Sequence, residues 1–176
     1  AKNEKIPDSL SSDVKKLREQ FDQYYLSSYF VFYDILFIDI EGTAFYTIRK
    51  ETDTHASLIN EKDSIGKLGE VISQKPDHEV FIDFYNYPPS SEPAAFFVEP
   101  IFNKGIHAGW IALQCSINKL NTIFASTDEL GKTGETFLVN QNGLMLTESN
   151  FKGYSTILKL HLDDRNIKAK FKNEIG

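Results

Sequence analysis

Residues that commonly carry chemistry are sparse in this chain and form no catalytic or metal-binding pattern. None of its four histidines has HExxH spacing, and the single cysteine, Cys115, excludes an internal disulfide and a thiolate zinc site. No G-x-S-x-G, P-loop or G-x-G-x-x-G motif occurs. Asp39, Glu41 and Gly42 faintly suggest a calcium loop, but its other ligands are missing and a turn explains them better. The sequence therefore predicts no catalytic residue, no metal and no cofactor.

A binding pocket is the better candidate for a functional site. Trp110 and Gln114 fall on one face of an expected strand, together with Ala112 and Ser116. Aromatic walls with a few oriented polar groups are typical of small-molecule sites. The alternative is ordinary packing, in which the aromatic side chains fill the core and the polar ones satisfy loop backbone groups. The candidate pocket residues are Tyr46, Asp83, Tyr85, Tyr87, Phe97, Trp110 and Gln114.

Composition limits the partners that this chain is expected to have. The net charge of −6 and the isoelectric point near 5.2 argue against nucleic acid and disfavour an anionic lipid surface. One cysteine is compatible with the cytosol or with a bacterial periplasm. No apolar run is long enough to span a bilayer, and the N-terminus lacks a signal-peptide h-region. We expect any link to a membrane to run through flanking helices outside this sequence.

Periodicity predicts an α+β domain in which helices position an aromatic-rich antiparallel sheet. Apolar residues at spacings of three and four predict an amphipathic helix that begins near Pro7 and contains Leu10, Val14, Leu17 and Phe21. A hairpin follows, with Gly42 at its turn. Further predicted elements are strands over 80–85, 94–102 and 105–117, a proline-stiffened loop at 87–91, and helices over 64–73, 118–124 and 156–162.

The sequence pattern of the hairpin recurs later in the chain. Residues 36–42 and 137–143 each place an apolar triplet before Asp or Asn and end in a glycine, at an offset of 101 residues. Chance similarity between hairpins is common, but this offset is close to the length of a small α+β domain. We therefore predict a first module over 1–126 and the start of a second module over 127–176, incomplete within this sequence.

A series of short motifs carries a family resemblance over residues 20–165. In order, they are YDILFID (33–39), EG (41–42), KETD (50–53), FIDF (81–84), PPS (88–90), EPAAF (92–96), PIF (100–102), GWIALQ (109–114), GKTGETFLV (131–139) and GLMLTES (143–149). Singly each motif is weak. As an ordered set they resemble the double-Cache, PAS-like sensor domains of bacterial and archaeal chemoreceptors, sensor histidine kinases and cyclases.

The resemblance implies a fold and a function. It implies a five-stranded antiparallel PAS-like sheet with a long N-terminal helix, on the extracytoplasmic face of a membrane. Such a domain binds a small molecule and signals by ligand-biased displacement of helices, here in a homodimer formed through the N-terminal helix. A structural or protein-interaction module without a ligand is the alternative. The chain lacks the Tyr–Arg–Trp arrangement of amino-acid-binding relatives, so an amino-acid ligand is not supported, and no enzymatic activity is expected.

Overall fold

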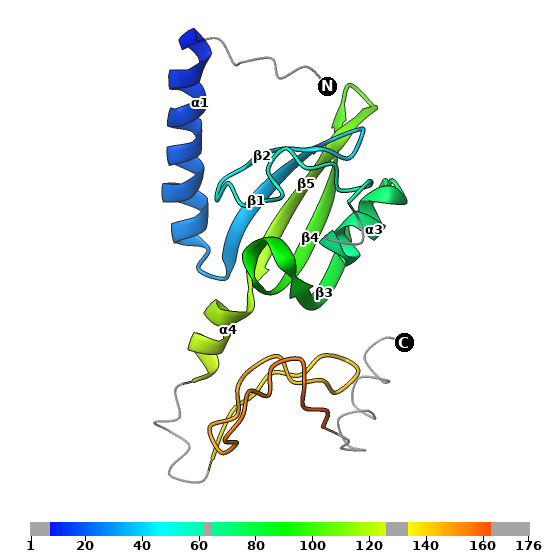
Figure 1. Ribbon diagram of the computed structural model, residues 1–176. Coiled ribbons are helices and arrows are strands. Elements are labelled where there is room, and N and C mark those ends of the chain that lie inside the picture. The colour runs from blue at the N-terminus through cyan, green and yellow to red at the C-terminus, as the bar shows by residue number, and fades with distance from the viewer. Residues whose placement is uncertain (1–7, 62–64, 126–133, 163–176) are drawn as a thin grey trace.

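The computed structural model describes residues 8–61, 65–125 and 134–162, and its centre is one five-stranded antiparallel sheet (Figure 1). Across the sheet the strand order is β2-β1-β5-β4-β3, which confirms the predicted number and direction of strands. The strands are β1 (Phe32–Asp39), β2 (Ala44–Thr47), β3 (Val80–Tyr87), β4 (Glu92–Asn103) and β5 (Ile106–Ser116).

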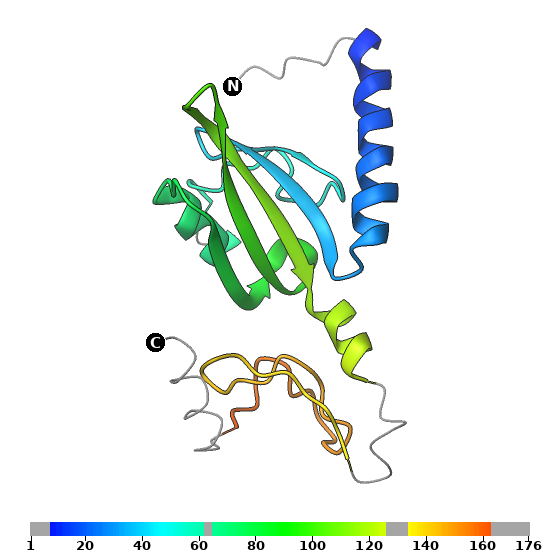
Figure 2. The ribbon, with the colours of Figure 1, turned by 180° about the vertical axis from the view of Figure 1, so that it is seen from behind.

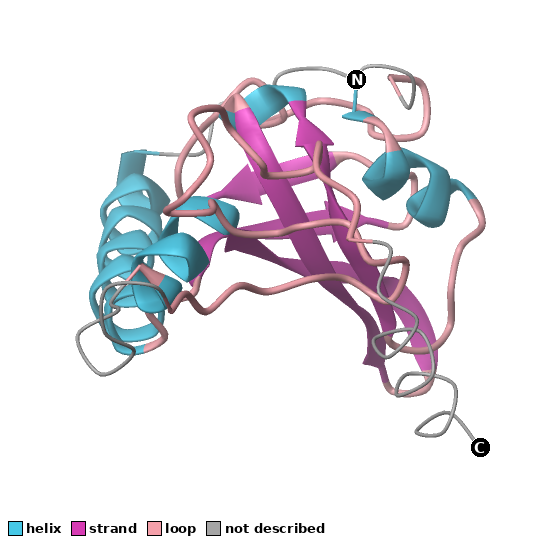
Figure 3. Ribbon diagram, turned by 90° about the horizontal axis from the view of Figure 1, so that it is seen from below, coloured by secondary structure: helices cyan, strands magenta, loops and turns pink. Residues whose placement is uncertain are grey.

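Helical elements surround the sheet. Viewed from below, the strands run through the middle of the molecule and the helices lie around them (Figure 3). No described helix has both the length and the apolar character needed to cross a membrane. The helical elements are α1 (Asp8–Gln20), which runs directly into the π-helical η1 (Phe21–Leu26), then α3 (Lys67–Ser73), the short 3-10 helix η2 (Pro88–Ser90) and α4 (Ile117–Phe124).

The two faces of the sheet pack against different parts of the chain. On the inner face, defined here by Leu36, Phe96 and Trp110, side chains form one cluster with residues of α3 and of the segment 51–61. On the outer face, defined by Phe37 and Leu113, side chains pack instead against η1. Figure 1 shows α3 and the connecting segments in front of the sheet, and Figure 2 shows the other side, with α1 along one margin.

Alternation along β5 assigns its side chains to these faces as predicted. Trp110 and Ala112 lie in the inner cluster, whereas Ile111 and Leu113 pack on the outer side. Cys115 is buried, as expected, and burial raises the pKa of its thiol to about 11. A buried thiol of that pKa carries almost no thiolate at neutral pH, so it acts as an apolar packing residue.

The similarity predicted between the two hairpins also appears in their turns, which share a side-chain hydrogen bond and a glycine of positive φ. At the first turn, the Thr43 amide donates to Asp39 Oδ1 at 2.8 Å, and Gly42 has a φ of 81°. At the second turn, the Leu144 amide donates to Asn140 Oδ1 at 3.0 Å, and Gly143, the counterpart of Gly42, has a φ of 80°. A side chain at Gly42 would also meet Ile59, since an added Cβ would lie 2.5 Å from its Cδ1.

Two of the predicted helices differ from the structure. The helix expected over 64–73 begins at Lys67, and Ser64 lies outside the described residues. The helix expected over 156–162 is wrong, because this segment forms turns and pairs with the backbone of residues 143–147. The Leu158 amide donates to the Met145 carbonyl, and Leu158 itself has a φ of 54°. Tertiary pairing therefore overrides the helical spacing of its apolar residues.

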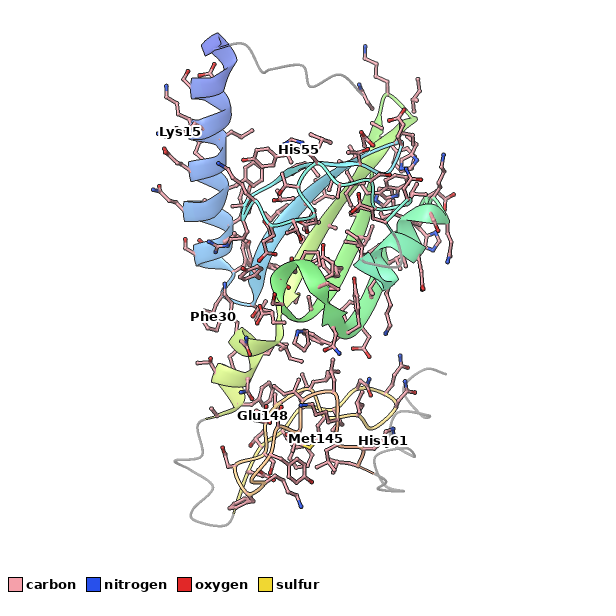
Figure 4. The ribbon with its side chains drawn as sticks, viewed as in Figure 1. Lys15, Phe30, His55, Met145, Glu148 and His161 are labelled. Carbon is pink, nitrogen blue, oxygen red and sulfur yellow. The ribbon has the colours of Figure 1, made fainter. Side chains whose placement is uncertain are left out.

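The C-terminal segment, 134–162, packs against one end of the sheet. Met145, Glu148 and His161 belong to it and lie below the strands in Figure 4. Leu146 joins a buried cluster with Phe84 and other residues of the sheet. The Glu148 amide also donates to Asn121 Oδ1 of α4 at 2.8 Å, so this segment contacts both the sheet and the helix that follows β5.

Candidate ligand-binding site

Two adjacent strands place a carboxyl group and a carboxamide opposite each other on the inner face. Asp34 of β1 is the direct register partner of Gln114 of β5, and Phe96 of β4 is its partner on the other side. Both polar side chains have 0% exposure. They lie among apolar residues, since Leu36 and Ala112 follow the same face of the same two strands.

Gln114 has no hydrogen-bond partner at either end of its amide. Its Oε1 and Nε2 are both buried and unpartnered. Buried side-chain polar atoms almost always have a partner. Leaving one without any costs about 1–3 kcal/mol. An amide held in this way is therefore a group with unused donor and acceptor capacity on the inner face.

Asp34 has one oxygen fully used and the other unpartnered. Its Oδ1 accepts three backbone hydrogen bonds, from Ile35 at 2.7 Å, Ile48 at 2.9 Å and Arg49 at 3.1 Å. These bonds fix the end of β2 to the start of β1. Its Oδ2 is buried without a partner. Burial raises the pKa of this carboxyl to about 7, although the three amides lower it, and the nearby charge of Asp53 raises it further.

Asp53 repeats this arrangement from the segment that covers the inner face. The Tyr87 hydroxyl donates to its Oδ2 at 2.5 Å, whereas Oδ1 has no partner and the residue has 0% exposure. Burial raises the pKa of Asp53, and the bond from Tyr87, together with the nearby backbone amides of Asp53 and Thr54, opposes that rise. The pKa of Tyr87 is itself raised, by burial first and then by the carboxylate that it contacts.

A third carboxyl group, that of Glu51, lies at the margin of this site. The Tyr33 hydroxyl donates to Glu51 Oε1 at 2.8 Å, and Oε2 is buried without a partner. Burial raises the pKa of Glu51, the charge of Asp53 adds to the rise, and the guanidinium of Arg49 lowers it. We refer to Asp34, Glu51 and Asp53 as the acidic cluster, because the charge of Asp53 acts on both of the other two carboxyl groups.

Aromatic side chains form the wall of the inner face, and protein groups satisfy their polar atoms. The Trp110 indole N–H donates to the Pro76 carbonyl at 2.8 Å, and the Tyr85 hydroxyl donates to the Ile65 carbonyl at 2.9 Å. The ring of Tyr87 packs edge-on against that of Phe96, with centroids 4.9 Å apart. Within the described part of the chain, the buried side-chain polar atoms without partners belong to Gln114 and the acidic cluster.

The structure brings four of the seven predicted pocket residues together and separates the other three. Tyr85, Tyr87, Trp110 and Gln114 all lie on the inner face. Tyr46 and Phe97 lie on the outer face, where Tyr46 packs with Phe37 and Phe97 with Phe81.

Asp83 also lies apart from these four residues. The register of β3 shifts between Ile82 and Tyr85, so Asp83 lies in a bulge. There its Oδ2 accepts a hydrogen bond from Asn140 Nδ2 at 2.9 Å. A carboxylate predicted for the pocket instead connects the sheet to the C-terminal segment.

Comparison with known proteins rests on structure alone, since no family model and no curated protein matches the sequence. The extracellular domain of mmHK1S-Z3, assigned to a histidine kinase, has a TM-score of 0.54 at 12% identity, over 94% of this chain and 74% of its own. The chemoreceptor PctC of Pseudomonas aeruginosa PAO1, in complex with GABA, has a TM-score of 0.53 at 15% identity, over 86% and 68%. An extracellular ligand binding receptor from Desulfohalobium retbaense has a TM-score of 0.54 at 12% identity. The match covers 93% of this chain but only 32% of that receptor chain.

The chain shares its fold with these extracellular and ligand-binding domains. This confirms the expected likeness to Cache-type sensors at the level of architecture. Identities of 12–15% carry no residue-by-residue assignment, so the site must be judged from this chain's own side chains.

The sequence patterns did not predict the acidic cluster, although one of its members, Asp34, stands at a position that indicates burial. Asp34, Leu36 and Ile38 alternate along β1, so an acid occupies a position whose neighbours of the same parity are core residues. Glu51 and Asp53 had no such signal. They lie in an irregular segment that reaches the inner face only through tertiary packing.

The outer face of the sheet carries an apolar groove. This groove, of about 720 Å³, lies between η1 and the sheet, with an almost wholly apolar lining. Phe21, Phe37, Phe97 and Leu113 are among its walls, and Glu79 and Glu99 also line it. Among the described residues, no group of three or more His, Cys, Asp or Glu side chains lies so as to hold a metal ion.

Proposed function

We propose that this chain is the extracytoplasmic sensing part of a transmembrane signalling receptor and that it binds a small molecule on the inner face of its sheet. The first module, 1–126, carries the site, and 127–176 begin a second, membrane-proximal module. The fold supports this proposal, because proteins that share it include a chemoreceptor solved in complex with GABA and an extracellular ligand binding receptor. The output domain would be a kinase, a chemoreceptor signalling domain or a cyclase.

One observation carries the proposal: three fully buried polar side chains with unpartnered atoms share the inner face. Gln114, Asp34 and Asp53 each have 0% exposure, and each keeps at least one N or O atom without a hydrogen bond. An apolar side chain at Gln114 would remove this penalty, whereas Asp34 and Asp53 each also accept hydrogen bonds from the protein through their second oxygen. Polar groups retained against that penalty are expected where a ligand supplies the missing partners.

The path from this site to the rest of the receptor is short. Gln114 lies on β5 just before α4, which begins at Ile117 and is capped by Ser116. Lys119 of α4 donates from Nζ to the Phe32 carbonyl of β1 at 2.7 Å. A ligand that shifts β5 relative to β1 would therefore move α4 and the segment bonded to it. We propose this displacement, in a homodimer formed through the N-terminal helix, as the signal.

A thermal-shift screen against pooled small solutes tests the proposal. At least one pool should raise the melting temperature of the wild-type domain, because ligand binding stabilises the folded state. Gln114→Leu should abolish that rise, whereas Glu99→Gln, on the outer face, should retain it. No response from any pool by a folded wild-type domain would contradict ligand sensing.

The runner-up is a protein-interaction module without a ligand, and a specific observation favours it. Phe45, Phe81 and Phe97 are at least one-third exposed, and the rings of the last two pack at a tilt, with centroids 4.9 Å apart, on the outer side. Exposed aromatic groups of this kind mark contact surfaces for other proteins. Binding that depends on Phe81 and Phe97 but not on Gln114 would support this reading.

A further inference from the structure

We infer that the inner-face site takes the protonated amino group of a small organic cation that carries no carboxylate. This inference rests on the proposed function of the inner face and names the chemical class of its ligand. It follows from which atoms lack partners, from the sign of the buried charges and from the absence of a buried cation among the described residues.

The unpartnered atoms match the donors of a primary ammonium group. Asp34 Oδ2, Asp53 Oδ1 and Gln114 Oε1 are three buried acceptors without a donor. A primary ammonium group has three N–H donors and no acceptor. Charge-assisted bonds from ammonium to carboxylate are about twice as strong as neutral ones. The Nε2 of Gln114 remains as a donor for a neutral oxygen of the ligand.

The buried charges are all of one sign. Among the described residues, the buried polar and charged side chains include Asp34 and Asp53 but no Lys, Arg or His. The exposed Arg49 donates from Nε to the Tyr33 carbonyl, and its guanidinium lies 5.4 Å from the centre of the Tyr33 ring. A ligand carboxylate would therefore meet buried negative charge without a buried cation to balance it. This disfavours acids and zwitterions as ligands.

A metal ion fits the same atoms less well than an ammonium group. The described residues contain no group of three or more possible His, Cys, Asp or Glu ligands placed around one point. Calcium takes six to eight oxygen ligands, more than two carboxylates and one amide supply. Two carboxylates and an amide oxygen are a sufficient acceptor set for an ammonium group.

Binding of such a cation is linked to the protonation of Asp34. Its pKa of about 7 means that the free site is partly protonated at neutral pH, and an adjacent ammonium group favours the carboxylate form. Affinity should therefore rise between pH 6 and pH 8, with release of a proton on binding near pH 6. The titratable and charged groups that face this site are Tyr33, Arg49, Glu51, Asp53, Tyr85 and Tyr87.

Matched butyl compounds provide the test. Calorimetric titrations at pH 8 would compare n-butylamine, 1-butanol, butyrate and γ-aminobutyrate, with calcium chloride as the metal arm. We expect n-butylamine to bind most tightly. Asp34→Asn should weaken its binding by about tenfold or more, because one charged partner is lost. Gln114→Leu should also weaken it, and the control Glu99→Gln should leave it unchanged.

The outcomes separate the ligand class from the proposed function. Tighter binding of butyrate, γ-aminobutyrate or calcium than of n-butylamine would overturn the ammonium inference, as would an amine affinity that neither site variant changes. If only 1-butanol or neutral solutes of the pooled screen bind through Gln114, the ligand class fails and sensing stands. If no pooled solute and no butyl compound binds the folded wild-type domain, both fail. Should Asp34→Asn not fold, Asp53→Asn tests the same pairing from the covering segment.

Discussion

The inner and outer faces of the same sheet differ both in burial and in the polarity of the side chains that they carry. The inner face is sealed by α3 and the segment 51–61, yet it encloses a buried amide and buried carboxyl groups with unpartnered atoms. The outer face is left partly open beside η1, yet the lining of its groove is almost wholly apolar. The inner face thus encloses fully buried polar side chains, whereas fully buried side chains are usually apolar. This difference is the reason for proposing the inner face as the side that binds a polar ligand.

The largest expected effect concerns packing on the two faces. Trp110→Ala should lower the free energy of unfolding by about 3–5 kcal/mol, since it leaves a large cavity and an unpaired Pro76 carbonyl. Phe97→Ala on the outer face, where the side chain is 37% exposed, should lower it by about 1–2 kcal/mol. Urea denaturation measures both. Equal losses of unfolding free energy in the two variants would contradict the difference in packing between the two faces.

The next effect is a pH dependence that belongs to the inner face. The folded-state pKa of Asp34, about 7, lies above its ordinary value of 3.8, so between these values the folded state keeps a proton that the unfolded state has lost. Stability of the wild type should therefore fall as pH rises from about 4 to 7, by on the order of a few kcal/mol, and then level off.

Two substitutions isolate that dependence. Asp34→Asn keeps an oxygen for the three backbone amides and removes the buried charge, so it should flatten much of the fall. The raised pKa values of Glu51 and Asp53 should leave a smaller slope of the same sign. Glu99→Gln, a loss of the same charge on the outer side, should not alter the profile. Thermal unfolding between pH 4 and pH 8 distinguishes them; an unchanged slope in Asp34→Asn would refute the role given to this carboxyl.

The smallest effect on stability is expected at the centre of the site. Gln114→Leu replaces an unpartnered amide with an apolar group of similar size, so it should leave stability unchanged or raise it by up to about 1 kcal/mol. Gln114→Leu should therefore separate stability from ligand response. A loss of more than about 2 kcal/mol would show that the amide has a structural partner in solution.

Much of the fold follows from local pattern, and the site follows from it only in part. Alternation along β5 assigned Trp110 and Gln114 to one face, and the positive φ of Gly42 was expected from its place in a turn. A single bulge in β3 separates Asp83 from Tyr85 and Tyr87, because one extra residue reverses the side on which the side chains after it lie.

Other features depend on contacts that no local pattern records. Asp53 reaches the inner face from an irregular segment and is held there by Tyr87, 34 residues further along the chain. The segment 156–162 has helical spacing, but its backbone groups bond to residues 143–147 instead. In both places the decisive partner is distant in sequence, so composition and periodicity could not identify it.

The most direct test of the account is the side-chain amide signal of Gln114 in a ¹H–¹⁵N NMR titration with n-butylamine. The signal is assigned by its absence from Gln114→Leu. We expect this signal to move and saturate in the wild type and in Glu99→Gln, and to need about tenfold more amine, or more, to move as far in Asp34→Asn. Resonances of outer-face residues such as Phe97 and Ile111 should move less. A Gln114 signal that stays fixed while the outer-groove resonances shift would contradict the account and assign binding to the other face.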